Sequence, residues 1–141
     1  MLKLPRQSGW ISSSGKNIEL FEKKLSKYVN RKYGCAVSNG TAAIDIAVQS
    51  LEIGVGDEVI LPSFTIISTI LQIVRSGAKP VLIDSDPLTW NMNVDQIEAK
   101  ITSNTKAILA VHIYGLPVEI KNLIDLCKKY NLKLIEDAAE V

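Results

Sequence analysis

From residue 33 onward, short apolar runs alternate with segments in which apolar residues recur every three or four positions. The apolar runs predict strands at residues 33–38, 58–61, 80–83, 107–113 and 133–135. The periodic segments predict helices between them, at residues 41–51, 64–74, 94–101 and 120–130. Strands this apolar, separated by helices, are typical of a mostly parallel sheet covered by helices on both faces. We therefore expect an α/β fold.

One more helix is predicted ahead of this alternating part. Residues 18–32 carry apolar side chains at helical spacing, after a polar loop over residues 9–15. Farther along, Gly77 is placed to end one helix and Asn93 to cap the next. No internal repeat or linker interrupts the chain, so we expect one domain or a piece of one.

Composition narrows the class of protein. The chain has 141 residues, of which 47% are hydrophobic and 22% charged, with a formal net charge of +1. The charges are interspersed and form no basic block, which argues against a nucleic-acid partner. No apolar run is long enough for a membrane span, and the first nine residues lack the apolar core of a signal peptide.

Cysteine and histidine usage gives little support to a metal site. Cys35 and Cys127 fall within predicted regular structure, and His112 is the only histidine. No His, Cys or carboxylate spacing typical of a metal site occurs. We expect both cysteines to be reduced, buried thiols of a cytoplasmic protein.

Polar groups follow the ends of the predicted strands. Ligands of open parallel sheets collect outside the carboxyl ends of the strands. The groups at these ends are the Ser38–Thr41 run, Ser63, Asp84, His112 and Asp137. If the strands are parallel, these groups share one edge of the sheet, and this convergence predicts a ligand site there.

The Gly40-Thr41-Ala42 run suits a phosphate group. Glycine allows close approach of the backbone, and the start of the following helix presents free amides and the positive end of its dipole. The alternative is that Thr41 caps an ordinary helix. The chain contains neither a Walker loop nor a GxGxxG motif, which argues against nucleoside triphosphates and common dinucleotides.

Asp137 ends an apolar strand, where a carboxylate needs a cationic or hydrogen-bonding partner. A pyridinium nitrogen would meet this need, so a phosphorylated aromatic cofactor, pyridoxal 5′-phosphate (PLP), is the candidate ligand. The alternatives are that Asp137 caps the next helix or binds a metal.

Glu140 is expected to lie either near the same ring or at a solvated position of a helix. His112 is either functional or structural, and Trp10, Trp90 and Tyr114 either line a pocket or pack.

Several motifs follow one another along the chain, namely GWISSSGKNIELFE, SNGTAA, GDEVILPSFT, GAKPVLID, VHIYG and LIEDAAE. In order and spacing they resemble the DegT/DnrJ/EryC1/StrS family of sugar aminotransferases. The resemblance implies the PLP fold type I, a homodimer, and transfer of an amino group from glutamate to a nucleotide-linked keto sugar. TWNMNVDQIEAKI and EDAAE are most similar to the perosamine-synthase branch, which acts on a GDP-linked 4-keto-6-deoxymannose. A role in surface-polysaccharide (O-antigen) synthesis follows from the same resemblance.

The resemblance also implies roles for single residues. The residues expected to hold the cofactor phosphate are Gly40, Thr41 and Ala42. Asp137 is expected to pair with the pyridine nitrogen, and Glu140 to lie near the ring hydroxyl. Ile66 occupies a position where the family usually has an aromatic residue that stacks on the ring. The residues expected near the substrate or cofactor are Trp10, Ser12, Ser13 and His112.

The family's Schiff-base lysine and C-terminal small domain would lie beyond Val141. We therefore expect residues 1–141 to be an incomplete large domain, inactive by itself, with a loop and helix over residues 9–32 and alternating β/α structure over residues 33–141. Three alternatives remain. They are a PLP-dependent sugar 3-dehydratase of the same family, a non-catalytic remnant that dimerises or binds phosphate, and an unrelated α/β nucleotide-binding domain.

Overall fold

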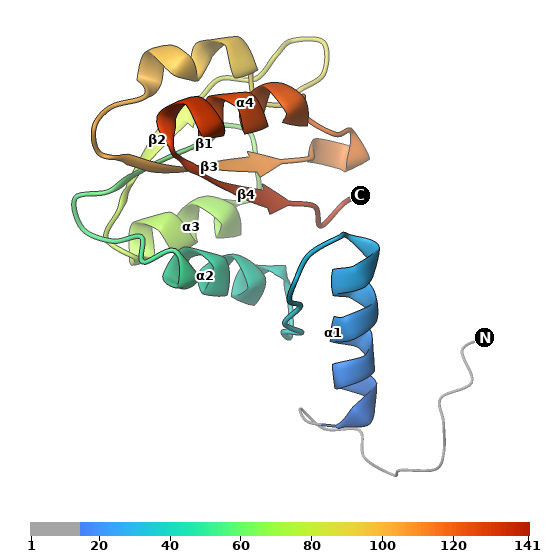
Figure 1. Cartoon of the computed structure of the whole chain (residues 1–141). Helices are drawn as coiled ribbons and strands as arrows, with labels where there is room; N and C mark the ends of the chain where they lie inside the picture. The colour runs from blue at the N-terminus through green and yellow to red at the C-terminus, as the bar shows by residue number, and fades with distance from the viewer. Residues whose placement is uncertain (1–14) are drawn as a thin grey trace. The chain divides into compact units, whose positions relative to one another are not determined.

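A four-stranded parallel sheet organises residues 39–141 in the computed structural model, which describes residues 15–141 (Figure 1). The strands are β1 (Glu58–Pro62), β2 (Lys79–Ile83), β3 (Thr105–Val111) and β4 (Lys133–Asp137), in the spatial order β2-β1-β3-β4. Every neighbouring pair is parallel. The two central strands, β1 and β3, are almost completely buried, as expected for a sheet covered on both faces.

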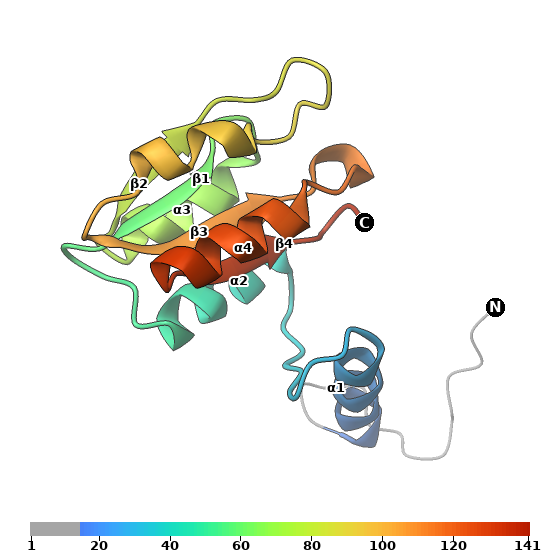
Figure 2. The same cartoon turned by 45° about the horizontal axis from the view of Figure 1, so that its top comes forward.

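Helices cover the two faces of this sheet (Figures 1 and 2). On one face lie α2 (Gly40–Ser50) and α3 (Ile67–Arg75). On the other lie α4 (Ile120–Tyr130) and two 3-10 helices, η1 (Val94–Gln96) and η2 (Glu98–Lys100). The predicted α/β architecture, with helices on both faces, is thereby confirmed.

Alternating side chains of the central strands form two separate cores. Leu61 and Leu109 pack with Ile73 of α3 on one face. Ile60 and Ile108 pack with Leu123 of α4 on the other. Successive strand residues point to opposite faces, so each core receives every second residue of β1 and β3. The sheet is thereby held between two apolar layers.

The helix α1 (Lys16–Tyr28) belongs to a second compact unit, which the structure describes over residues 15–38. Its carboxylate Glu22 accepts a hydrogen bond from the backbone N–H of Ala36 at 2.7 Å. A side chain at Gly34 would come within 2.7 Å of the Glu22 carbonyl oxygen, so only glycine fits this close approach. The predicted helix 18–32 is shorter than expected, because Asn30 adopts a left-handed conformation after Val29.

The prediction of a strand over residues 33–38 is wrong, because this segment is irregular. A strand needs a neighbour for its backbone hydrogen bonds, and no described strand pairs with these residues. Cys35 is consequently exposed, so the prediction that it is buried is also wrong. Cys127 is buried in a core as expected, and its burial raises the pKa of the thiol.

Other helix and strand boundaries differ from the predicted ones by a few residues. The helix α3 starts at Ile67 instead of residue 64, since Ile66 is still extended. The predicted helix 94–101 is divided into η1 and η2, and Asn93 caps η1 by accepting a hydrogen bond from the Asp95 N–H. Gly77 ends α3 with a positive φ of 84°, as predicted. The predicted strand 107–113 stops at Val111, and a short 3-10 helix, η3 (Ile113–Gly115), follows.

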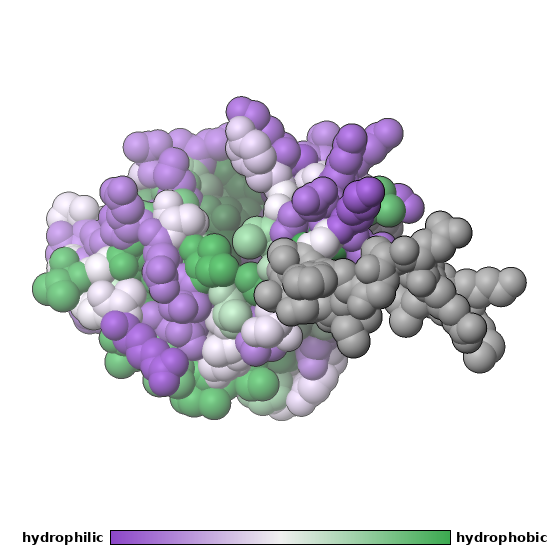
Figure 3. All heavy atoms as spheres, turned by 90° about the horizontal axis from the view of Figure 1, so that it is seen from below, coloured by the Kyte–Doolittle hydropathy of each residue, from purple (hydrophilic) through white to green (hydrophobic). Residues whose placement is uncertain are grey.

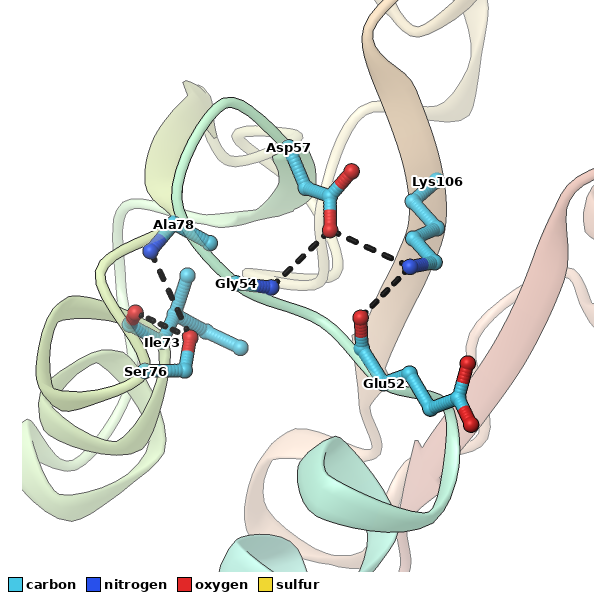
Figure 4. A network of polar contacts seen from close by, with 7 residues as sticks. All are labelled: Glu52, Gly54, Asp57, Ile73, Ser76, Ala78 and Lys106. Carbon is cyan, nitrogen blue, oxygen red and sulfur yellow. Dashed lines mark hydrogen bonds and ion pairs between the residues drawn. The ribbon is translucent and has the colours of Figure 1, made fainter.

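The amino ends of the strands are tied together by a polar network (Figure 4). The Asp57 carboxylate accepts hydrogen bonds from the Gly54 N–H at 2.9 Å and from Lys106 Nζ at 3.2 Å. Lys106, on β3, also donates to the Glu52 carbonyl. The Gly54 N–H, and then Lys106, lower the pKa of the Asp57 carboxyl. The network joins the loop before β1 to β3, at the sheet edge opposite the strand ends considered below.

Some apolar side chains remain exposed on α3, namely Ile67, Leu71 and Val74. Figure 3 looks at the side of the molecule on which α2 and α3 lie, and it shows hydrophobic residues among hydrophilic ones there. Within residues 15–141, no helix is both long and apolar enough to cross a bilayer.

Candidate active site

The carboxyl edge of the sheet brings together the polar groups predicted there. Asp137 is the last residue of β4, and His112 directly follows β3. Ser63 and Asp84 directly follow β1 and β2. Because the four strands are parallel, these residues lie along one edge.

A pocket at this edge lies between the start of α2 and the end of β4. One wall is made by α2 and the other by the end of β4 and the turn after it. The lining residues are Gly40, Ala43, Ile44, Ala47, Ile135, Glu136, Asp137, Ala138 and Ala139. Most of these side chains are small, so backbone groups and the Asp137 carboxylate are accessible from one space.

The start of α2 presents free amides. Asn39 is the N-cap, and its side chain accepts a hydrogen bond from the Ala42 N–H at 2.9 Å. The alternative that Thr41 caps the helix is therefore wrong. Backbone N–H groups in a first helical turn, such as those of Gly40 and Thr41, have no partner within the helix. A Cβ added at Gly40 would meet no atom within 4 Å, so the backbone there is open to a ligand.

Two hydrogen bonds hold the Asp137 carboxylate. Thr69 Oγ1 donates to Oδ2 at 3.2 Å, and the Ala139 N–H donates to Oδ1 at 3.2 Å. A carboxylate has about four lone-pair positions, so each oxygen keeps capacity for another donor. Among residues 15–141, no group of three or more His, Cys, Asp or Glu side chains is arranged to hold a metal ion.

His112 is buried and engaged with its surroundings, with 7% of its surface exposed. Its Nδ1 accepts a hydrogen bond from the Val118 N–H at 3.2 Å, which in a neutral ring places the proton on Nε2. Nε2 faces the Glu136 carboxylate at 3.6 Å. The His112 backbone N–H donates to the Asp137 carbonyl at 3.1 Å. His112 therefore joins the ends of β3 and β4 to the loop that follows β3.

Glu140 lies beside the same loop and outside any helix. Its carboxylate accepts a hydrogen bond from the Tyr114 N–H at 2.6 Å. Tyr114 is left-handed, and Gly115 has a φ of 80°. A Cβ at Gly115 would come within 2.9 Å of the Glu140 carbonyl oxygen. Glu140 thus supports a tight turn at the sheet edge.

The remaining predicted residues are dispersed. Ile66 is exposed just before α3. The ring of Phe64 contacts two of them: its centroid lies 5.6 Å from that of Trp90 and 6.2 Å from that of Tyr114. Trp90 lines a second pocket, together with Phe64 and residues 84–87. Three predicted substrate residues lie outside the described part of the chain, namely Trp10, Ser12 and Ser13.

Sequence reasoning missed Thr69, which the structure places against Asp137. Thr69 is fully buried on α3 and also accepts a hydrogen bond from Thr65 Oγ1 at 3.4 Å. The signal in the sequence is a pair of threonines four residues apart, the second of them on the apolar face of a helix.

Comparison with known proteins identifies the family. The profile of the DegT/DnrJ/EryC1/StrS aminotransferase family matches residues 2–141. The chain belongs to this family. The resemblance of its motifs is thereby confirmed over nearly the whole length.

Relatives within the family include a GDP-perosamine synthase of Escherichia coli O157:H7. It is 47% identical over 133 residues, which are 94% of this chain and 36% of that protein. A dTDP-3-amino-3,6-dideoxy-alpha-D-galactopyranose transaminase of Aneurinibacillus thermoaerophilus is 45% identical over 134 residues, or 95% of this chain and 37% of that protein. The chain thus spans about a third of the length of these relatives.

Solved structures agree with this assignment. The chain is similar to NtdA from Bacillus subtilis, solved with the bound cofactor PMP, with a TM-score of 0.84 and 41% identity. The match covers 89% of this chain and 29% of that one. The sheet and its two helical layers are therefore part of the large domain of PLP fold type I, as predicted.

Proposed function

We propose that these residues form the cofactor-binding part of a PLP-dependent aminotransferase that moves an amino group from glutamate to a nucleotide-linked keto-deoxysugar. The observation that carries this proposal is the shared pocket, which has the free amides of α2 at one side and the Asp137 carboxylate at the other. The Schiff-base lysine and the small domain implied by the resemblance are proposed to lie outside residues 1–141.

The start of α2 fits the phosphate group of PLP. Gly40 leaves open space beside its backbone, and a helix N-terminus attracts anions through its amides and dipole. We assign Gly40, Thr41 and Ala42 to this phosphate. Because the Ala42 N–H already donates to the Asn39 side chain, we expect the amides of Gly40 and Thr41 to be the main donors, with Ala42 lying beside the phosphate.

Asp137 fits the opposite end of the cofactor. Its carboxylate is oriented by Thr69 and Ala139, and it keeps lone pairs for a protonated ring nitrogen. When bound, PLP supplies an electron sink, and a carboxylate at the ring nitrogen maintains it. Ile66 is proposed to cover the ring and Glu140 to lie near the ring hydroxyl. The bond from the Tyr114 N–H to Glu140 would hold that carboxylate in place.

The substrate proposal rests on the relatives. One of them is a GDP-perosamine synthase, and we infer that the substrate of this protein is a GDP-linked 4-keto-6-deoxy sugar. Trp10, Ser12 and Ser13 are proposed to contact it. His112 is also proposed to lie near the substrate or the cofactor, and its backbone N–H holds the ends of β3 and β4 together.

Assembly and location are proposed on the same basis. The exposed apolar residues of α3 support association into a homodimer. We place the protein in the cytoplasm, in a pathway that supplies an amino sugar to a surface polysaccharide such as O-antigen.

The test uses the protein that carries this chain, supplied with PLP, glutamate and a GDP-linked 4-keto-6-deoxy sugar. We expect formation of 2-oxoglutarate and an amino sugar. Asp137→Asn should reduce turnover a hundredfold or more, on the order expected when one partner of a charge pair is lost. The melting temperature without cofactor should stay close to wild type, since Asp137 is only partly buried.

Asp125→Asn on α4 is the matched control, because Asp125 is exposed and pairs only loosely with Lys128 at 4.0 Å. Its turnover should stay within twofold of wild type. Near-normal turnover of Asp137→Asn would contradict the assignment of Asp137. A deoxygenated keto sugar without a new amino group would instead indicate the dehydratase.

A further inference from the structure

Thr69 lies on the side of α3 that faces the sheet, and none of its surface is exposed. A buried hydroxyl without a hydrogen-bond partner would destabilise the fold. A threonine inside a helix can satisfy its hydroxyl by donating to the backbone carbonyl four residues earlier. Thr69 instead donates to Asp137 Oδ2, which is 68 positions later in the chain. The hydroxyl is therefore directed at the proposed cofactor site.

A second threonine supports this orientation. Thr65 Oγ1 donates to Thr69 Oγ1 at 3.4 Å, so the single proton of the Thr69 hydroxyl remains for Asp137. Thr65 is partly exposed and precedes Ile66, the residue proposed to cover the cofactor ring. The two hydroxyls form a chain from the loop after β1 to the end of β4. Hydrogen bonds arranged in such a chain polarise and strengthen one another.

The geometry points to Thr69 as a positioning residue that holds the Asp137 carboxylate for the ring nitrogen of the cofactor. This inference rests on the proposed function, since it presupposes that Asp137 pairs with the ring. The Thr69 and Ala139 donors contact different oxygens, and together they restrict rotation of the carboxylate. The carboxylate then meets the cofactor already oriented, which reduces the entropy lost on binding.

The experiment measures PLP affinity in the protein that carries this chain, prepared without cofactor. Thr69→Val keeps the shape of the side chain and removes the hydroxyl. We expect the dissociation constant of PLP to rise about tenfold, as for loss of a hydrogen bond to a charged group. Thr69→Ser keeps the hydroxyl and should bind PLP within about threefold of wild type. If Thr69 had only a structural role, Thr69→Val would change the protein less than Thr69→Ser, because Val matches the shape of Thr more closely.

A matched control removes the same kind of bond elsewhere. Thr102 Oγ1 donates to Glu58 Oε2 at 2.6 Å, near the amino edge of the sheet. Thr102→Val should lower the melting temperature but leave PLP affinity within twofold of wild type. Should Thr69→Val fail to fold, Thr65→Val is the second variant, because Thr65 is partly exposed. It should weaken PLP binding about threefold, and unchanged binding there would contradict the inference.

The background variant Asp137→Asn separates the two proposals. If Thr69 acts through Asp137, Thr69→Val should no longer change PLP affinity once Asp137 is Asn. A tenfold effect that persists there would overturn the positioning role, as would unchanged affinity of Thr69→Val in the wild-type background. If Asp137→Asn itself binds PLP normally and turns over normally, it is the proposed function of Asp137 that fails.

Discussion

Carboxylates at both ends of the sheet are held by threonine hydroxyls from distant parts of the chain. At the carboxyl edge, Thr69 donates to Asp137 at 3.2 Å. Near the amino edge, Thr102 donates to Glu58 at 2.6 Å, and Lys79 Nζ lies 2.9 Å from the same carboxylate. The first arrangement leaves lone pairs toward a pocket, whereas the second includes an ion pair between β1 and β2. A hydrogen bond from threonine to a carboxylate thus orients a proposed ligand group at one edge of the sheet and stabilises the fold at the other.

Glu58 leads to a prediction about acid sensitivity. The Thr102 hydroxyl, and then Lys79, lower the pKa of the Glu58 carboxyl from its usual value of 4.5. Above pH 4.5 the carboxyl is ionised in both the folded and unfolded states, and its full stabilisation is present. As the pH falls below this value, the unfolded state takes up a proton first, so the stabilisation decreases.

Thermal melting of wild type and Glu58→Gln at several pH values checks this. The wild type should melt at the higher temperature at pH 7, and the difference should shrink as the pH falls through and below 4.5. A difference that is constant from pH 7 to pH 3 would show that the charge of Glu58 contributes nothing.

The helix α2 combines a structural cap with the proposed phosphate site in one turn. Asn39 uses its side chain on the Ala42 N–H, and the amides just before Ala42 remain available. Capping and ligand binding therefore depend on different N–H groups. Substitutions at Asn39 should consequently separate the stability of the helix from the affinity for an anion.

Replacing Asn39 tests this separation. Asn39→Ala should reduce the free energy of unfolding by about 1 kcal/mol, the usual contribution of an N-cap. Asn39→Asp keeps a good cap, so stability should be retained, but its negative charge should weaken binding of the PLP phosphate several-fold. Urea denaturation without cofactor and PLP titration measure the two effects. Equal PLP affinity of the Asp variant and wild type would argue against phosphate at this turn.

The sheet as a unit depends on its central strands, β1 and β3, whose residues contribute to the cores on both faces. Leu109 and Ile108 are adjacent in sequence, fully buried, and belong to opposite cores. Loss of a side chain from β3 leaves a cavity that α2, α3 and α4 cannot easily fill, because each already packs against its own face of the sheet.

A pair of leucines provides the corresponding prediction. Leu109→Ala should reduce the free energy of unfolding by about 2–5 kcal/mol, the range for buried leucines. Leu88→Ala is the control, because Leu88 is 89% exposed, and its effect should be within about 0.5 kcal/mol of zero. Chemical denaturation of both variants gives the comparison. Similar losses at the two positions would contradict the buried placement of β3.

The sequence predicted the parts of this structure that depend on local patterns. The helices α2 and α4 and the strands β1, β2 and β4 appear within a few residues of their expected places. Their apolar spacing reports directly which side of each element is buried. The motifs also indicated the protein family, because their order and spacing can be seen in the sequence without a structure.

Only the tertiary structure decided features that require distant partners. The irregular path of residues 33–38 follows from the lack of a pairing strand among the described residues, which no local pattern records. The bond between Thr69 and Asp137 joins residues 68 positions apart, one on α3 and the other at the end of β4. Periodicity specifies the face that a side chain occupies, whereas the partner it meets there depends on the path of the whole chain.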